Sequence, residues 1–438
     1  MKKSKVLPID TSLHFIGAGG AGMAPMALIM KEKGYKVSGS DLADSGNLRL
    51  LADNGVKIFC GNHNLKNLPN DKNAIIVASS AISQENPELS TALERGLKIF
   101  RRGEFLAKIA ESYDKSVAVG GSHGKTTITA MITYCLKELG FSPGFMIGGK
   151  MKGLKHSGAA GDGTIFVTES DESDGTNAMI SPYIAVVSNI DDDHAWNFSG
   201  EEELFANFAK FAFNSQKLVY GKSEKADKIF LKHNSKTALE ISNTTRLPQA
   251  FSEWAPFQKL NALMAVHAVN LLSGTDLEKA LLALINFPGV ERRFSLRFKN
   301  EKLQIIEDYA HHPTELSSLM DSLDKIRKNR RLHIVFQPHR YARLKKYFDR
   351  FICELRRADK VTVLPVFSAW TPGNDIKSEN LVSELNKNAG NNDFANFADQ
   401  DFKSLSKKLL ADDKEPELLV IVGAGDCDKL VENLLKTV

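Results

Sequence analysis

The chain has 438 residues, of which 42% are hydrophobic and 25% are charged, and its net charge is +4. This composition is ordinary for a globular protein of about two to four domains, and the charge is too small to indicate a nucleic-acid-binding protein. No run approaches the roughly 20 apolar residues that cross a bilayer, and no signal-peptide core follows the first residues, so we expect a cytoplasmic protein without membrane insertion. The cysteines are isolated and indicate neither a disulfide framework nor a zinc site; they are Cys60, Cys135, Cys353 and Cys427.

The chain opens with a strand, a glycine turn and a helix. We expect a strand over residues 13–16, a helix over residues 23–33 and a strand over residues 35–40 that ends at Asp41. The turn has the pattern G-x-G-x-x-G, formed by Gly17, Gly19 and Gly22. This pattern is typical of dinucleotide-binding folds, in which the backbone approaches a diphosphate and an acidic residue lies near a ribose. The alternative is a tight turn without a ligand.

Further strands and helices complete this first unit. The apolar patterns predict strands at residues 74–78 and 98–100 and helices at residues 87–95 and 104–111. A polar turn at residues 112–115 then marks the first domain boundary.

A second glycine loop lies within SVAVGGSHGKTTITA, residues 116–130. An apolar strand runs into glycines, and Lys125 and Thr126 open a helix, which is the order of a phosphate-binding loop. Lys125 is expected to neutralise phosphate charge and the Thr126 hydroxyl to bind Mg²⁺. Val119 departs from the general pattern, which has glycine at this position. Two phosphate loops argue against a nicotinamide enzyme and favour one nucleotide-linked substrate together with ATP.

Strands and helices alternate through the rest of the chain. In the middle of the chain we expect strands at residues 117–119, 165–168 and 184–188 and helices at residues 261–272 and 277–285. After Phe294 the pattern restarts, with strands at residues 303–307, 332–336, 360–364 and 418–422. The sequence therefore predicts three α/β domains without repeats, at residues 1–113, 114–294 and 295–438.

Nine blocks of sequence carry a family resemblance. In chain order they are HFIGAGGAGMAPMA (14–27), SSAISQENPEL (79–89), GGSHGKTTITAM (120–131), ESDESDGT (169–176), NIDDDH (189–194), GVERRF (289–294), DYAHHPTEL (308–316), FQPHRYAR (336–343) and GAGD (423–426). Together they resemble the Mur ligases, and among these most closely the members that add L-alanine.

The resemblance implies a fold and an activity. The fold has an N-terminal Rossmann-like domain for a UDP-sugar, a central P-loop ATPase domain with a mostly parallel sheet, and a C-terminal Rossmann-like domain for ATP and the amino acid. The implied reaction joins L-alanine to the carboxylate of UDP-N-acetylmuramate with ATP and Mg²⁺, through an acyl phosphate, in peptidoglycan precursor synthesis and hence in cell wall biogenesis, cell shape and cell division. A monomer or weak homodimer is expected.

The resemblance also assigns residues to roles. The catalytic set is Lys125, Glu169, His194 and Arg293, and the metal ligands are Thr126, Glu169 and His194. ATP is assigned to Gly121, Ser122, His123, Gly124, Lys125, Thr126, Thr127, Asn261, Arg293 and Asp308. The other substrates are assigned to Gly17, Gly19, Gly20, Gly22, Met23, Asp41, Ser80, Tyr309, His311, Arg340 and Arg343. Arg292 is expected at the surface, and the group that deprotonates the amine is left open.

Several positions are also compatible with a purely structural role, and others depart from the family pattern. The acidic block that begins at Glu169 is also compatible with a solvated turn, and His194 with a structural histidine. Where related ligases have G-x-H-N-x-x-N-A, residues 255–262 keep only the second asparagine, Asn261, while Phe257 and Gln258 offer a ring and an amide. Lys210 is at the offset of a metal-binding carbamylated lysine, but a solvated lysine is the expectation.

Two alternatives remain. One is a ligase that recycles a tripeptide onto the same UDP-sugar; the Gly19–Gly20 pair, Ser173 and the arginines of HRYAR argue against it. The other is a nucleotide-sugar-binding paralogue with impaired catalysis, suggested by the altered helix and a short segment at residues 220–254. Retention of Lys125, Thr126, Glu169 and His194 argues against that paralogue.

Overall fold

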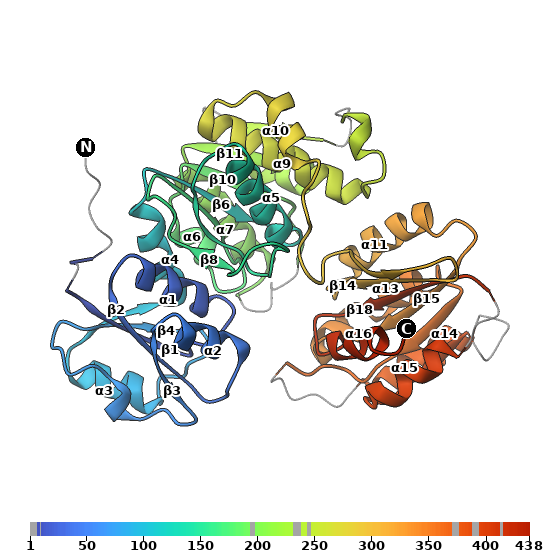
Figure 1. Ribbon diagram of the computed structural model, residues 1–438, viewed down its shortest axis with the longest axis horizontal. Coiled ribbons are helices and arrows are strands. Elements are labelled where there is room, and N and C mark those ends of the chain that lie inside the picture. Colours follow the sequence, from blue (N-terminus) through green and yellow to red (C-terminus); the bar gives the residue numbers. More distant parts are fainter. Residues whose placement is uncertain are drawn as a thin grey trace. The chain divides into compact units, whose positions relative to one another are not determined.

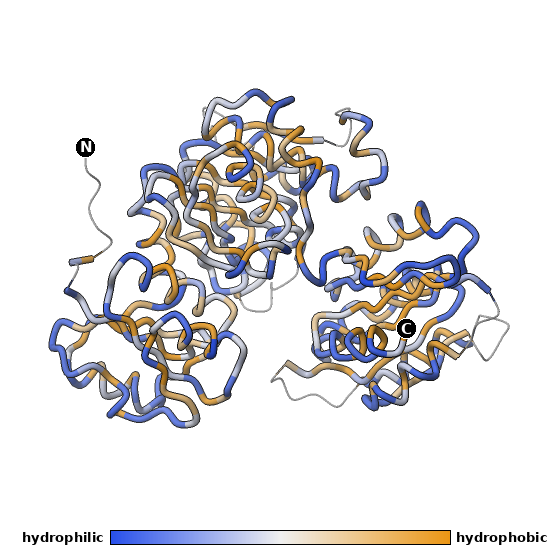
Figure 2. The backbone as a smooth tube through the Cα atoms, viewed as in Figure 1, coloured by the Kyte–Doolittle hydropathy of each residue, from blue (hydrophilic) through white to orange (hydrophobic). Residues whose placement is uncertain are grey.

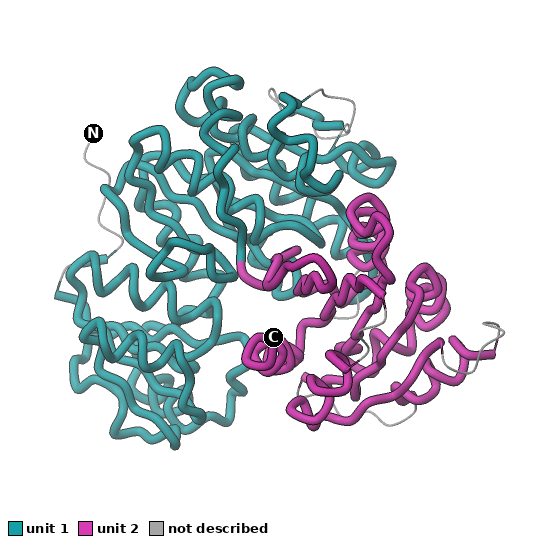
Figure 3. The backbone as a smooth tube through the Cα atoms, turned by 45° about the vertical axis from the view of Figure 1, so that its right-hand side comes forward, with its two compact units in different colours: residues 1–290 teal, residues 291–438 magenta. Residues whose placement is uncertain are grey.

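The computed structural model describes residues 7–8, 10–192, 198–230, 238–242, 247–369, 376–387, 394–411 and 415–438. Two compact units divide the chain, residues 1–290 and residues 291–438 (Figure 3). Three mostly parallel α/β sheets lie within them, two in the first unit and one in the second (Figure 1). The predicted fold class is confirmed.

The first sheet has the order β3-β2-β1-β4-β5, and all of its strands are parallel. Its strands are β1 (Ser12–Ile16), β2 (Lys36–Asp41), β3 (Lys57–Cys60), β4 (Ile75–Ala78) and β5 (Lys98–Arg101). The helices that accompany it are α1 (Met23–Glu32), α2 (Gly46–Asp53), η1 (Leu65–Asn67), α3 (Pro87–Glu94) and α4 (Arg102–Glu111). The predicted elements of this unit are confirmed, with α4 beginning two residues early, at Arg102.

The second sheet has the order β12-β11-β10-β6-β9-β7-β8, and only β8 runs antiparallel. Its strands are β6 (Lys115–Gly120), β7 (Gly144–Met146), β8 (Gly158–Ala159), β9 (Ile165–Glu169), β10 (Ile184–Val187), β11 (Lys217–Gly221) and β12 (Ala238–Ile241). Its helices are α5 (Lys125–Glu138), α6 (Thr176–Met179), α7 (Glu201–Asn214), α8 (Glu224–Phe230), η3 (Gln249–Phe251), α9 (Pro256–Ser273) and α10 (Leu277–Leu284). The central strands β9, β6 and β10 are those that the apolar runs predict.

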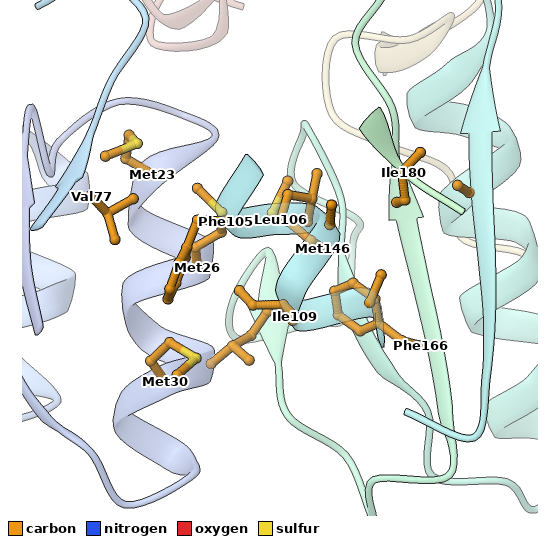
Figure 4. Packing of buried hydrophobic residues seen from close by; sticks show 14 of the residues in the cluster. Met23, Met26, Met30, Val77, Phe105, Leu106, Ile109, Met146, Phe166 and Ile180 are labelled. Atoms are coloured by element: carbon orange, nitrogen blue, oxygen red, sulfur yellow. The ribbon is translucent and has the colours of Figure 1, made fainter. Parts of the chain in front are cut away.

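A shared core joins these two sheets. Figure 4 shows Met26 and Met30 of α1 against Phe105 and Ile109 of α4, with Phe166 of β9 on the far side of α4. All of these side chains are buried and belong to one hydrophobic cluster. Burial of apolar area therefore holds the first two sheets in one compact unit.

The second unit is built on the order β13-β14-β18-β15-β16-β17, with only β13 antiparallel. Its strands are β13 (Ser295–Lys299), β14 (Leu303–Asp308), β15 (Arg331–Phe336), β16 (Lys360–Val363), β17 (Ala395–Phe397) and β18 (Glu417–Val422). Its helices are α11 (Pro313–Ile326), α12 (Tyr341–Lys346), α13 (Phe348–Leu355), α14 (Ser378–Lys387), α15 (Phe402–Leu410) and α16 (Asp428–Leu435).

Hydrophobic residues fill the interior of each unit (Figure 2), as expected for sheets covered by helices on both faces. Among the helices of the described residues, none combines the length and the apolar character that a membrane span requires.

Candidate active site

The first glycine loop connects β1 to α1 and rests on the end of β2. The backbone N–H groups of Gly17 and Ala18 both donate to the Ser40 carbonyl at 2.9 Å, and the Gly19 N–H donates to Asp41 Oδ2 at 2.9 Å. A Cβ on Gly19 would stand 2.8 Å from Ser45 Oγ, so this position is crowded. Asp41 lies where the sequence predicts it and stabilises the loop itself.

Other residues assigned to the sugar nucleotide surround this loop. The Gly20 carbonyl accepts the N–H groups of Met23 and Ala24, which begins α1, and the Met23 side chain is buried. Ser80 follows β4 and is exposed; its hydroxyl donates to Asp174 Oδ2 at 3.4 Å.

The second glycine loop connects β6 to α5. Gly121 has φ +119° and Gly124, the N-cap of α5, has φ +85°, both in the region that favours glycine. A Cβ on Gly124 would lie 3.1 Å from Asn261 Oδ1, which places the retained asparagine of α9 beside this loop. Thr127 is partly buried on the first turn of α5.

The loop is braced by the block that follows β10. The N–H of His123 donates to Asn189 Oδ1 at 2.9 Å, and Ser122 Oγ accepts from the Asp191 N–H at 2.8 Å. His123 Nε2 lies 3.5 Å from a carboxylate oxygen of Asp191. This block ends at His194, which is outside the described residues.

Lys125 is bonded to a carboxylate and to its own loop. Its Nζ lies 2.9 and 2.8 Å from the two oxygens of Glu172 and donates to the Gly121 carbonyl at 2.6 Å. The Glu172 side chain is 1% exposed. Lys125, which the sequence assigns to phosphate, is therefore paired with Glu172 in this structure.

The acidic block after β9 is built into the protein. Arg102 lies 3.0 Å from Asp171 and 2.5 Å from Asp174. Burial opposes ionisation of Asp171, but Arg102 and Lys125 outweigh it and hold the Asp171 pKa at about 2. Burial, reinforced by Asp171 and opposed by Lys125, raises the pKa of Glu172 to about 7. These ion pairs argue against the solvated-turn interpretation, although the Asp171 side chain is 38% exposed.

Oxygen ligands meet at the start of α5. The Thr126 hydroxyl donates to Glu169 Oε2 at 3.1 Å, and Glu169 Oε1 accepts from the Gly148 N–H at 2.5 Å. A hydroxyl and a carboxylate at this separation are hard oxygen donors that fit Mg²⁺. Lys210 is exposed on α7, as expected for a solvated lysine.

At the start of α9, the Gln258 side chain is partly used within the protein. Gln258 Oε1 accepts from the N–H of Ala255 at 2.9 Å and so caps the helix. This oxygen is used within the helix, which leaves the NH₂ of the amide as its remaining polar group.

Within the second unit, Asp308 ends β14 and accepts the N–H groups of Phe294 and Ala310, each at 2.7 Å. Burial raises its pKa to about 6, against the pull of Arg293. The Arg293 guanidinium lies 4.5 Å from the centre of the Tyr309 ring, and His311 Nδ1 is 3.0 Å from the Tyr309 carbonyl.

Arginines around the GAGD and HRYAR blocks have different surroundings. Arg292 is not a surface residue: its Nη2 donates to the Gly423 and Gly425 carbonyls at 3.0 and 2.8 Å and supports the GAGD loop. Arg340 precedes α12 with φ +65°, so it does not share a helical face with Arg343. Arg343 is 2% exposed, with Nη1 3.0 Å from His339 Nδ1.

Sequence reasoning missed Arg102 and Glu172. Arg102 lies on α4, and its partners Asp171 and Asp174 follow it by 69 and 72 residues in the sequence. No local spacing of residues indicates a contact over such a separation. Glu172 was within a recognised acidic block, and its proximity to the lysine loop could have been inferred because β6 and β9 are adjacent strands.

Comparison with known proteins supports one family. Three family models match: Mur ligase family, catalytic domain, at residues 12–114; Mur ligase middle domain at residues 119–255; and Mur ligase, glutamate ligase domain, at residues 292–425. The UDP-N-acetylmuramate–L-alanine ligases of Carboxydothermus hydrogenoformans and Aquifex aeolicus are 33% and 32% identical to the chain. The matches cover 97% of this chain in both cases and 96% and 97% of those proteins.

A solved structure agrees. UDP-N-acetylmuramate-alanine ligase MurC from Thermotoga maritima matches with a TM-score of 0.79 and 26% identity over 97% of this chain and 98% of that one. With about a third of its residues identical to curated relatives over nearly its whole length, the chain belongs to the Mur ligase family.

Proposed function

We propose that the chain is an ATP-dependent ligase that joins L-alanine to the carboxylate of UDP-N-acetylmuramate in peptidoglycan precursor synthesis. The observation that carries the proposal is the presence of two phosphate-type glycine loops, one after β1 and one after β6, within one compact unit. The relatives with 32–33% identity that bear this activity in their names support the choice of substrates.

In this proposal the first loop holds the diphosphate of the UDP-sugar. Gly17, Gly19, Gly20, Gly22, Met23, Asp41 and Ser80 form or border this site. The positive end of α1 faces the diphosphate and favours its negative charge.

The second loop holds ATP. Lys125 leaves Glu172 and neutralises charge on the transferred phosphoryl group, while the sugar carboxylate attacks the γ-phosphorus of ATP, the bond to the bridging oxygen breaks, ADP leaves and an acyl phosphate forms. Thr126 and Glu169, with His194, would hold Mg²⁺, which supplies charge neutralisation to the phosphates when bound. Gly121, Ser122, His123, Gly124, Thr127 and Asn261 complete the nucleotide site.

The second unit supplies the remaining roles. Arg293 and Asp308 are assigned to ATP, and Tyr309, His311, Arg340 and Arg343 to the incoming amino acid, whose amine attacks the acyl phosphate and expels phosphate. We further propose three domains with the boundaries at residues 113 and 294, a monomer or weak homodimer, no nucleic-acid partner, and a cytoplasmic location, where ATP is available.

The test is product formation at saturating ATP with different amines. L-Alanine should be used well and glycine or L-serine less well, because a methyl-sized difference in a pocket is worth about 1–3 kcal/mol. Little or no product is expected with L-alanyl-γ-D-glutamyl-diaminopimelate. A preference for this tripeptide would replace the proposal by the recycling ligase, and absence of phosphate release with every amine would favour the paralogue with impaired catalysis.

A further inference from the structure

A side chain at Gly22 would crowd the side chain of Arg102. Its φ of −89° and ψ of −18° are open to any residue, so conformational freedom does not require glycine here. A Cβ at this position would instead lie 2.9 Å from Arg102 Nη1 and 3.2 Å from Arg102 Cδ. The last glycine of the first loop thus makes room for a guanidinium group from α4.

Arg102 is held in one orientation. Its Nε and Nη2 donate to Asp174 Oδ2 at 3.1 and 2.5 Å, and Nη2 also donates to Asp171 Oδ2 at 3.0 Å. Asp174 is itself fixed, because its Oδ1 accepts the N–H and the hydroxyl of Thr176. The Arg102 side chain is only 14% exposed.

The third nitrogen of this guanidinium is directed at the loop. Nη1 makes no hydrogen bond within the described part of the chain, whereas Nε and Nη2 are both used. It is also the nitrogen nearest to Gly22, at the N-terminus of α1. The first turn of α1 has no acidic residue and no side-chain cap, so this helix end retains its positive partial charge.

From this geometry we propose that Arg102 is a substrate-binding residue that donates Nη1 to the diphosphate of the UDP-sugar, and that Asp174 and Asp171 are positioning residues for it. The inference rests on the proposed function, because that function places a diphosphate at the first loop. A charge-assisted contact from a pre-oriented guanidinium is short and strong. The sequence motif of this loop contains no positively charged residue, and in this proposal Arg102 provides the positive charge.

The test separates the diphosphate from the nucleoside. Uridine and UDP are titrated into the full chain by calorimetry, and the ratio of their dissociation constants measures what the diphosphate contributes. Arg102→Gln should reduce this ratio by about tenfold or more and leave uridine binding within twofold. Arg102→Lys keeps the positive charge but loses the planar set of N–H donors of the guanidinium, so it should reduce the ratio by an intermediate amount.

Asp174→Asn distinguishes positioning from contact. It keeps Arg102 but weakens its anchor, so UDP affinity should fall by less than in Arg102→Gln, with uridine binding unchanged. Arg95→Gln is the matched control, since Arg95 is an exposed arginine at the end of α3, with Nη2 on the Pro69 carbonyl, and should behave as the wild type.

Two results would overturn the inference. One is an unchanged ratio of the uridine and UDP dissociation constants in Arg102→Gln and Arg102→Lys. The other is equal weakening of both ligands, which would indicate a purely structural role.

If Arg102→Gln does not fold, the same ratio measured for Arg102→Lys decides. If the wild-type chain binds neither uridine nor UDP, the proposed function fails, and the inference fails with it; normal UDP binding that ignores Arg102 defeats the inference alone.

Discussion

The two glycine loops have similar backbone positions, each between a central strand and a helix N-terminus, but they obtain positive charge differently. The second loop has its own cation, Lys125, which is neutralised by Glu172. The first loop contains no lysine or arginine, and the nearest guanidinium, that of Arg102, is anchored by Asp171 and Asp174 with Nη1 left over. Arg102 can therefore accept an anion on Nη1 while it keeps both of its ion pairs, whereas Lys125 must leave Glu172 to accept one.

The largest effect is expected at Lys125. Lys125→Ala should reduce phosphate release by about 10²–10³-fold or more, because the charge that develops on the phosphoryl group loses its partner. UDP affinity should not change, since the two loops are separate sites. Lys137→Ala, on the last turn of the same helix, is the control and should retain activity. Turnover of Lys125→Ala at the wild-type rate would remove the ATPase assignment.

The reciprocal experiment is Gly22→Ala. The new methyl group would stand 2.9 Å from Arg102 Nη1, whose guanidinium is pinned on its other side, so the nitrogen must move. UDP affinity should fall by about tenfold and ADP affinity should hold. Gly46→Ala is a matched control at the first residue of α2, because nothing lies within 4 Å of its Cβ position. Equal affinities in the two variants would contradict the role of space at Gly22.

Glu169→Gln tests the metal side of the second loop. Its amide oxygen can still accept from Gly148, but a neutral amide is a poorer ligand for a hard divalent cation. The Mg²⁺ concentration for half-maximal activity should rise by about tenfold, measured at fixed ATP. Glu138→Gln, at the end of α5, should leave it unchanged. An unaltered Mg²⁺ requirement in Glu169→Gln would remove Glu169 from the metal site.

A smaller, pH-dependent effect is expected at Glu172. Because its pKa is raised to about 7, lowering the pH from 8 to 6 protonates this carboxylate and releases Lys125 for phosphate. ADP should therefore bind a few-fold more tightly to Glu172→Gln than to the wild type at pH 8, and the difference should shrink at pH 6. Measuring both proteins at each pH removes the titration of ADP itself from the comparison. A constant difference, or weaker binding by the variant, would show that Glu172 does not compete with phosphate.

The sequence predicted the central strands and both loops because these are locally encoded. Buried apolar runs such as residues 117–119 end in glycine and polar residues, and strand, turn and helix follow one another along the chain. The edge strands β3 and β13 were not predicted, because charged residues such as Lys57, which is exposed, and Arg297, which is half-buried, break the apolar pattern.

Local sequence patterns alone did not identify the partners of the charged residues in the site. Arg102 and Glu172 are ordinary charged residues in their own segments, and their roles arise only when sheet pairing brings α4, β9 and the second loop together. Arg340 shows a related limit, since its positive φ interrupts the helix that the spacing of Arg340 and Arg343 suggested.

The Lys125–Glu172 pair has a consequence for the end of the catalytic cycle. If phosphate takes Lys125, as proposed, the 1% exposed carboxyl of Glu172 loses the cation that favours its charged form, so its pKa, already about 7 beside the lysine, rises further and the carboxyl takes up a proton. Nucleotide binding is then coupled to the uptake of a proton by Glu172. When ADP leaves, the proton is released and Lys125 pairs with Glu172 again, so in the proposed cycle product release is favoured as the pH rises.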